Sequence, residues 1–190
     1  LERLKKHSDD IEAEREKAYA KMRELRRIST KLVRDIQRGR AADFDATMAE
    51  CKPLAVALTA YSGKFGFIEE ALQEYAEAAL VQAFLNALPC PTVESLGCTE
   101  RTYLMGLSDA ISELRRRVLV LMREDKPDAA SAMFDMMDVL FGKLMMFDHT
   151  EAVLPLRREQ DALRAVVERT RADLTSYVCQ KRLEVKLGGA

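Results

Sequence analysis

The segment LQEYAEAALVQAFL, residues 72–85, decides the fold class of this 190-residue chain. Its apolar residues recur every three to four positions, which is the period of an amphipathic α-helix. The side expected to pack holds Leu72, Tyr75, Ala76, Ala79 and Ala83. The opposite side is expected to hold Glu70, Glu74, Glu77 and Val81.

Helical periodicity continues on both sides of this segment. A basic helix ends at Gly39, and further helices are expected over 41–60, 67–88, 99–123, 128–147 and from 151 past 177. No stretch alternates with the two-residue period of a strand. The sequence therefore predicts an all-α fold, with about six to seven amphipathic helices forming a single bundle and one domain over 1–190. Residues 186–190 are expected to be a frayed tail.

A second acidic pair follows in TYLMGLSDAISELRRRV, residues 102–118, where Asp109 and Glu113 lie four positions apart. Glu74 and Glu77 lie three apart, so each pair projects from one face of its helix. Four converging carboxylates would repel one another unless a divalent cation or shared protons neutralised them, and hard oxygen ligands suit Mg²⁺ or Mn²⁺. The pattern favours metal-assisted phosphodiester chemistry.

The alternative for these carboxylates is a solvated helix face, which is the common arrangement opposite an apolar stripe. Gly106, beside the second pair, argues against it. A glycine inside a helix costs about 1 kcal/mol relative to alanine, and the missing side chain is expected to leave room for a metal ion or a substrate backbone.

Net charge is −1, but residues 15–40 hold ten Lys or Arg against three acids, whereas residues 41–100 hold two against nine. On the basic helix, five cationic residues share one narrow sector over about 22 Å, which suits successive phosphates of a nucleic acid. They are Arg23, Arg27, Lys31, Arg34 and Arg38, called the cationic stripe below. The residues Ala18, Met22, Leu25, Ile28, Leu32 and Ile36 lie opposite. A solvated face is again the alternative.

Composition sets further limits. At 48% apolar and 32% charged, the chain is typical of a helix-rich globular protein. No apolar run approaches the roughly 20 residues of a membrane span, and the charged first residues do not resemble a signal peptide. Cysteines 51, 90, 98 and 179 lack paired CxxC spacing, which favours reduced thiols over disulfides or zinc ligands. We therefore expect a cytoplasmic protein without a membrane partner.

The two acidic segments resemble the translin and translin-associated factor X (TRAX) family of helical nucleic-acid-binding proteins. Residues 73–78 follow the pattern Q-E-Y-x-E-A, and residues 103–114 follow Y-L-x-G-x-x-D-x-x-x-E-L. Both patterns are those of the TRAX-like, catalytic branch, and the likeness extends over nearly the whole chain. This chain is shorter than eukaryotic members, with only a brief turn between the third and fourth predicted helices, which puts in doubt any function of the eukaryotic insertion.

The resemblance implies that Glu74, Glu77, Asp109 and Glu113 are the metal-binding catalytic residues of an Mg²⁺-dependent endoribonuclease, with Mn²⁺ as an alternative ion. The first three would be direct ligands and Glu113 a ligand or a water-orienting base. Family members form closed octameric shells around RNA, so a homo-octamer of the compact, archaeal type is expected here. Its ligands would be single-stranded or short duplex RNA, and single-stranded DNA.

The methionines at 133, 136, 137, 145 and 146 offer adaptable contacts between subunits, although core filling is their commoner use. Other function classes remain open: a non-catalytic shell that binds single-stranded RNA or DNA, and a purely structural oligomer. The scarcity of histidine, with only His7 and His149, counts against a ribonuclease A-type mechanism and against a ferritin-like di-iron centre.

Overall fold

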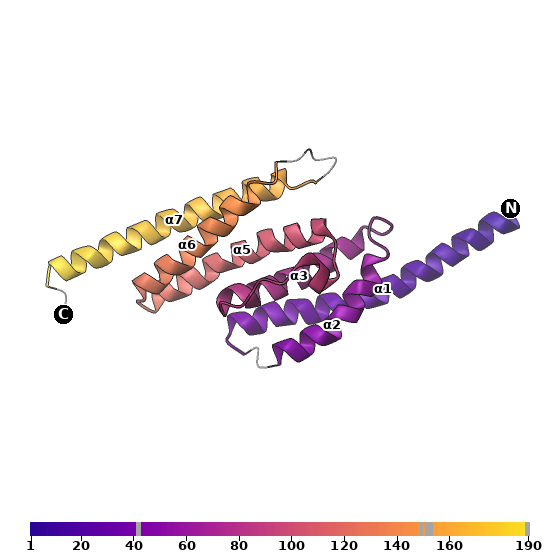
Figure 1. Cartoon of the computed structure of the whole chain (residues 1–190), viewed down its shortest axis with the longest axis horizontal. Coiled ribbons are helices and arrows are strands. Elements are labelled where there is room, and N and C mark those ends of the chain that lie inside the picture. The colour runs from indigo at the N-terminus through magenta and orange to yellow at the C-terminus, as the bar shows by residue number, and fades with distance from the viewer. Residues whose placement is uncertain (41–42, 149, 151–153, 189–190) are drawn as a thin grey trace. The chain divides into compact units, whose positions relative to one another are not determined.

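The computed structural model describes residues 1–40, 43–148, 150 and 154–188, and within these ranges it contains seven α-helices and no β-strand (Figure 1). In chain order the helices are α1 (Glu2–Gln37), α2 (Phe44–Thr59), α3 (Phe67–Leu85), α4 (Val93–Leu96), α5 (Glu100–Arg123), α6 (Pro127–Leu144) and α7 (Arg157–Lys186). The predicted all-α class is confirmed.

Helix boundaries differ from the predicted ones, and α6 ends at Leu144 instead of 147. The short helix α4 was missed. Helix α3 ends at Leu85 because Ala87 adopts a left-handed conformation (φ 51°) and the Leu88 amide donates to the Ala83 carbonyl at 2.9 Å. Glycine usually signals this kind of helix end, and none is present here. The predicted starts at 41 and 151 lie outside the described residues, as do 189–190 of the predicted tail.

The chain divides into two compact units, unit 1 (Leu1–Leu107) and unit 2 (Ser108–Ala190), with the boundary inside α5. The single domain over 1–190 stays a prediction.

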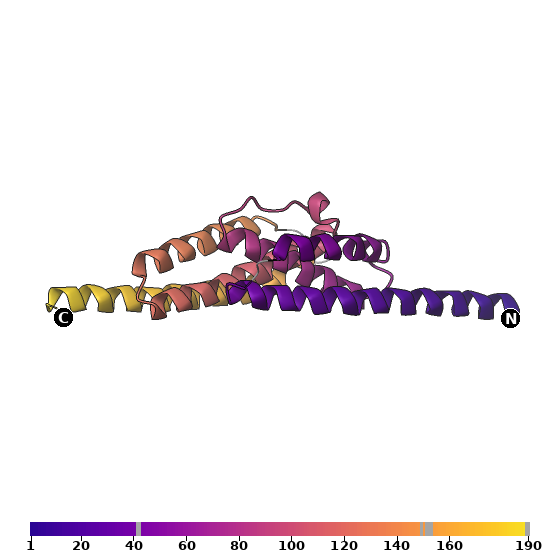
Figure 2. The same cartoon turned by 90° about the horizontal axis from the view of Figure 1, so that it is seen from below.

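Unit 1 is built on α3, against which α1 and α2 pack. Figure 2 shows α1 as one long unbroken helix. Residues 1–10 are exposed, and the first fully buried residue of α1 is Ala18. The predicted packing residues Ala18, Met22, Leu25, Leu32 and Ile36 are buried, and Ile28 is half-buried. The apolar side assigned to α1 is therefore confirmed.

Helix α3 is buried around most of its circumference, not only on the predicted packing side. Val81, placed on the acidic side from the sequence, is 1% exposed, so that assignment is wrong. The reason is that α3 is the central helix of unit 1 and has neighbours on several sides. Its partly or fully accessible polar residues are Glu69, Glu70, Gln73, Glu74, Glu77 and Gln82.

Gly106 is a point of close approach between α5 and α3 within unit 1. A Cβ atom at this position would lie 2.7 Å from the Gln73 carbonyl oxygen, 2.9 Å from the Ala76 Cβ and 2.9 Å from the Glu77 amide nitrogen. The space beside Gly106 is therefore filled by the backbone of α3. The expectation that this glycine leaves room for a metal ion or substrate is wrong, since its role is helix packing.

Gly106→Ala is accordingly expected to destabilise the protein by about 1–3 kcal/mol, because overpacking against backbone outweighs the better helix propensity of alanine. Gly142→Ala in α6 is the matched control, because a Cβ there meets nothing within 4 Å and alanine should stabilise by up to about 1 kcal/mol. Urea denaturation of both variants measures whether the free energy of unfolding falls in Gly106→Ala and rises in Gly142→Ala. Equal stability gains in both would contradict the packing role of Gly106.

Unit 2 consists of the second part of α5 with α6 and α7. The Arg115 guanidinium donates to Thr170 at 3.0 Å and to Asp173 at 2.8 Å, which ties α5 to α7. Among the α6 methionines, Met137 is fully buried. Met146, just beyond the helix end, is 79% exposed, and Met133, Met136 and Met145 are half-buried. Core filling accounts for Met137, while Met146 is accessible in the isolated chain.

All four cysteines are free thiols. Cys51 and Cys98 are buried, and burial raises the pKa of the Cys51 thiol to about 11. Cys90 and Cys179 are exposed, so only two of the four thiols lie in the core. Among the described residues, no helix combines the length and apolar character needed to cross a membrane.

Candidate functional site

The acidic face of α3 lies in unit 1 and is partly sheltered. Glu70 is exposed, whereas the Glu74 side chain is 24% exposed and Glu77 is half-buried. The helical spacing of Glu74 and Glu77 places both on the narrow accessible side that the packed neighbours leave open. Bulk water reaches these carboxylates less than it reaches an ordinary solvated face.

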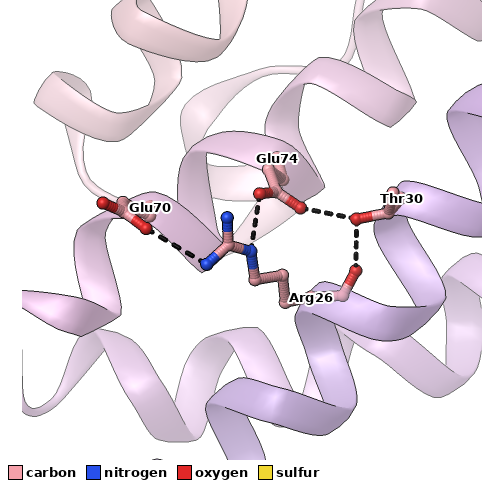
Figure 3. Close-up of polar contacts among 4 residues, drawn as sticks. All are labelled: Arg26, Thr30, Glu70 and Glu74. Atoms are coloured by element: carbon pink, nitrogen blue, oxygen red, sulfur yellow. Dashed lines mark hydrogen bonds and ion pairs between the residues drawn. The ribbon is translucent and has the colours of Figure 1, made fainter.

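Helix α1 contributes polar partners to this face, which contact Glu70 and Glu74 (Figure 3). The Arg26 Nε atom donates to Glu74 Oε1 at 2.8 Å, and the Arg26 Nη1 atom donates to Glu70 Oε2 at 3.2 Å. The Thr30 hydroxyl lies 2.8 Å from Glu74 Oε2 and 2.9 Å from the Arg26 carbonyl oxygen. Glu74 therefore has a protein partner at each carboxylate oxygen.

Sequence reasoning missed this role of Arg26 and Thr30. Arg26 and Thr30 lie four residues apart, as do Glu70 and Glu74, so each pair occupies one side of its helix. The matched spacing predicts the contact between these two pairs only when α1 is already known to pack on α3.

In unit 2, Asp109 and Glu113 are both half-buried on α5. Burial raises the pKa of the Glu113 carboxyl, the charge of Asp109 raises it further, and the Arg116 guanidinium opposes both effects. A carboxyl with a raised pKa is better suited to accept a proton near neutral pH than an ordinary glutamate is.

Glu113→Gln is expected to raise the melting temperature of metal-free protein at pH 7 and to change it little at pH 3. The folded pKa of Glu113 exceeds the unfolded one, so its contribution to stability is present at low pH and is lost as pH rises through the folded value. Glutamine has no ionisable carboxyl group, so the variant does not lose this stability as pH rises. Thermal melts in EDTA across this pH range test the sign, with the exposed Glu168→Gln in unit 2 as the control for loss of one charge.

The structure thus places Glu74 and Glu77 together on α3 and Asp109 and Glu113 together on α5. Within the ranges that the structure describes, no three Asp, Glu, His or Cys side chains gather as a ready-made metal site. The convergence of all four carboxylates stays a prediction. His7 is exposed on α1, and His149 lies outside the described residues.

Four members of the cationic stripe lie on the exposed side of α1, Arg38 follows at its C-terminal cap, and all five are exposed. A shallow surface hollow on α1 is lined by stripe residues together with Arg26 and Thr30. One acid interrupts the stripe, since Lys31 Nζ pairs with Asp35 at 3.1 Å. The surface can therefore offer several cations to successive phosphates, with Lys31 partly neutralised.

Solved structures similar to this chain cover nearly all of it. AfC3PO in complex with duplex RNA has 27% identity and a TM-score of 0.82, over 95% of this chain and 97% of that one. A crystal structure of AfC3PO has 28% identity, the same TM-score and the same coverage. Apo-NeC3PO, at 19% identity, a TM-score of 0.80 and coverage of 93% and 96%, shares the fold.

In sequence, an uncharacterised protein of Methanocaldococcus jannaschii is 32% identical over 123 residues, which are 64% of this chain and 55% of that protein. The chain thus spans about half the length of this curated relative. No protein-family model matches the chain.

The fold is therefore the helical fold of the AfC3PO structures, to which the chain is similar over nearly its whole length. These structures support the likeness to the translin/TRAX family that the two acidic segments predicted.

Proposed function

We propose that this protein is an Mg²⁺-dependent ribonuclease of the TRAX-like branch, which binds RNA within an oligomer and cleaves phosphodiester bonds. The observation that carries the proposal is the contact between α1 and α3, where Arg26 joins the basic face to Glu74 at 2.8 Å. A phosphate bound along α1 would lie beside the acidic face of α3. RNA binding and the Glu74–Glu77 part of the proposed metal site would then use adjacent surfaces of unit 1.

RNA binding is proposed from two supports. The exposed stripe offers cations that neutralise phosphates without reading bases. AfC3PO, to which the chain is similar over 95% of its length, forms a complex with duplex RNA. Binding with weak sequence preference is the expected behaviour.

The carboxylates fit a hard divalent cation, because they are oxygen donors in partly sheltered positions at helical spacing. Glu74, Glu77 and Asp109 are proposed as direct ligands of Mg²⁺ or Mn²⁺. A bound cation lowers the pKa of a water and stabilises charge that develops on the phosphate. Glu113, with its raised pKa, is proposed to orient and deprotonate the attacking water.

A second candidate function is non-catalytic binding of single-stranded RNA or DNA, as in translin. It is favoured by the ion pair between Arg26 and Glu74, which already neutralises one proposed ligand. This alternative predicts RNA binding without metal-dependent cleavage.

Assembly into a closed homo-octamer is proposed as the way in which the accessible carboxylates are removed from bulk water, since enclosure strengthens electrostatic interactions at the site. The cytoplasm is the proposed compartment, because four free thiols fit reducing conditions.

Incubation of the purified protein with end-labelled single-stranded and duplex RNA, in Mg²⁺, Mn²⁺ or EDTA, tests the function. Cleavage that requires a cation supports the ribonuclease. Binding that persists in EDTA, without products in either metal, would favour the translin-type alternative.

A further inference from the structure

Arg26 differs from the cationic stripe because its guanidinium turns towards carboxylates of α3 (Figure 3). It is half-exposed, so it lies at the border between the basic surface of α1 and the sheltered acidic face. Both sides of this contact belong to unit 1.

The two oxygens of Glu74 are held unequally. Oε1 accepts a charge-assisted hydrogen bond from Arg26 Nε at 2.8 Å. Oε2 faces the Thr30 hydroxyl at 2.8 Å, but that hydroxyl has one proton and also lies 2.9 Å from the Arg26 carbonyl oxygen. Oε2 therefore receives at most a shared proton and has spare capacity for a second positive partner.

Glu70 gives Arg26 an alternative partner. Its Oε2 atom accepts from Arg26 Nη1 at 3.2 Å, one helical turn before Glu74, and its side chain is 68% exposed. An Arg26 side chain that left Glu74 could therefore remain paired, with its other N–H groups directed to solvent or to a phosphate.

We propose that Arg26 is an exchangeable counter-ion: it holds Glu74 in metal-free protein and competes with a divalent cation for that carboxylate. On exchange it keeps Glu70 and adds a positive charge to the RNA-binding surface of α1. Arg26 is thus a positioning residue that acts through Glu74. The inference rests on the proposed function, because the competing cation is the one assigned to the acidic site.

The exposure of the Arg26–Glu74 ion pair sets how strongly Arg26 competes with a cation for Glu74. Ion pairs between exposed or half-exposed side chains contribute modestly, which corresponds to about a two- to fivefold effect on a competing equilibrium. Such a pair is strong enough to keep Glu74 ordered without metal and weak enough for a divalent cation to displace.

The test is direct metal binding without RNA. Calorimetric titration with Mn²⁺ should show that Arg26→Gln binds the ion about two- to fivefold more tightly than the unsubstituted protein, and Arg26→Lys should fall between them, since lysine keeps the charge without the forked geometry. Arg23→Gln, which removes one charge from the same helix face, is the matched control and should shift affinity less. Unchanged or weaker Mn²⁺ binding by Arg26→Gln would overturn the inference.

Glu74→Gln separates this inference from the proposed site. If Glu74→Gln weakens Mn²⁺ binding while Arg26→Gln equals the unsubstituted protein, the counter-ion role alone is wrong. If Glu74→Gln leaves Mn²⁺ binding unchanged, Glu74 is not a ligand, and both the proposed site and the counter-ion role are overturned.

Discussion

Alanine at Glu74, Glu77 or Asp109 is expected to reduce metal-dependent RNA cleavage by more than about 100-fold while leaving RNA binding nearly intact. Removing a ligand of the catalytic cation forfeits several kcal/mol of transition-state stabilisation, and each 1.36 kcal/mol is about tenfold in rate. The cationic stripe, which carries binding, is untouched. Single-turnover cleavage assays and filter binding in EDTA measure the two effects separately.

Glu70→Ala is the matched control for this series, because Glu70 also pairs with Arg26 yet lies outside the proposed ligand set. It should retain cleavage. Full activity in all three ligand variants would remove the proposed metal site, and equal losses in Glu70→Ala would mean that the shared contact with Arg26, not metal binding, accounts for the effect.

Replacement of Arg27, Lys31 and Arg34 by glutamine is expected to weaken binding to unrelated RNA sequences alike and to flatten its dependence on salt. Each lost phosphate contact reduces the slope of log K against log salt by about 0.7 for single strands, so the triple variant should lose about 2. Lys31 should contribute least, since it already pairs with Asp35. Fluorescence anisotropy at several salt concentrations gives the slope.

A second triple variant, Arg3, Lys5 and Lys6 to glutamine, removes the same charge from the exposed first turns of α1. It should change the slope much less than the stripe variant does. Equal slopes for both variants would assign the effect to net charge, and an unchanged slope for the stripe variant would leave the stripe as a solvated face.

The periodicity of apolar residues predicted the fold class because it depends on the amphipathic helix alone. The same period assigned Leu25 and Leu32 to the core side of α1, where both are buried. Val81 was assigned to the accessible side but is buried, because α3 has neighbours on several sides and therefore has no single apolar face. The period of apolar residues does not show how many neighbours a helix has.

What the sequence by itself determined is the content of each helix face, meaning an exposed cationic stripe on α1 and carboxylate pairs at helical spacing on α3 and α5. The partners of those faces were decided by tertiary structure. Arg26 meets Glu74, and Gly106 meets the backbone of α3, because residues about 48 and 30 positions apart come into contact only when the helices pack. Spacing along one helix is a local property, whereas the choice of a partner depends on which helices pack together and in what register.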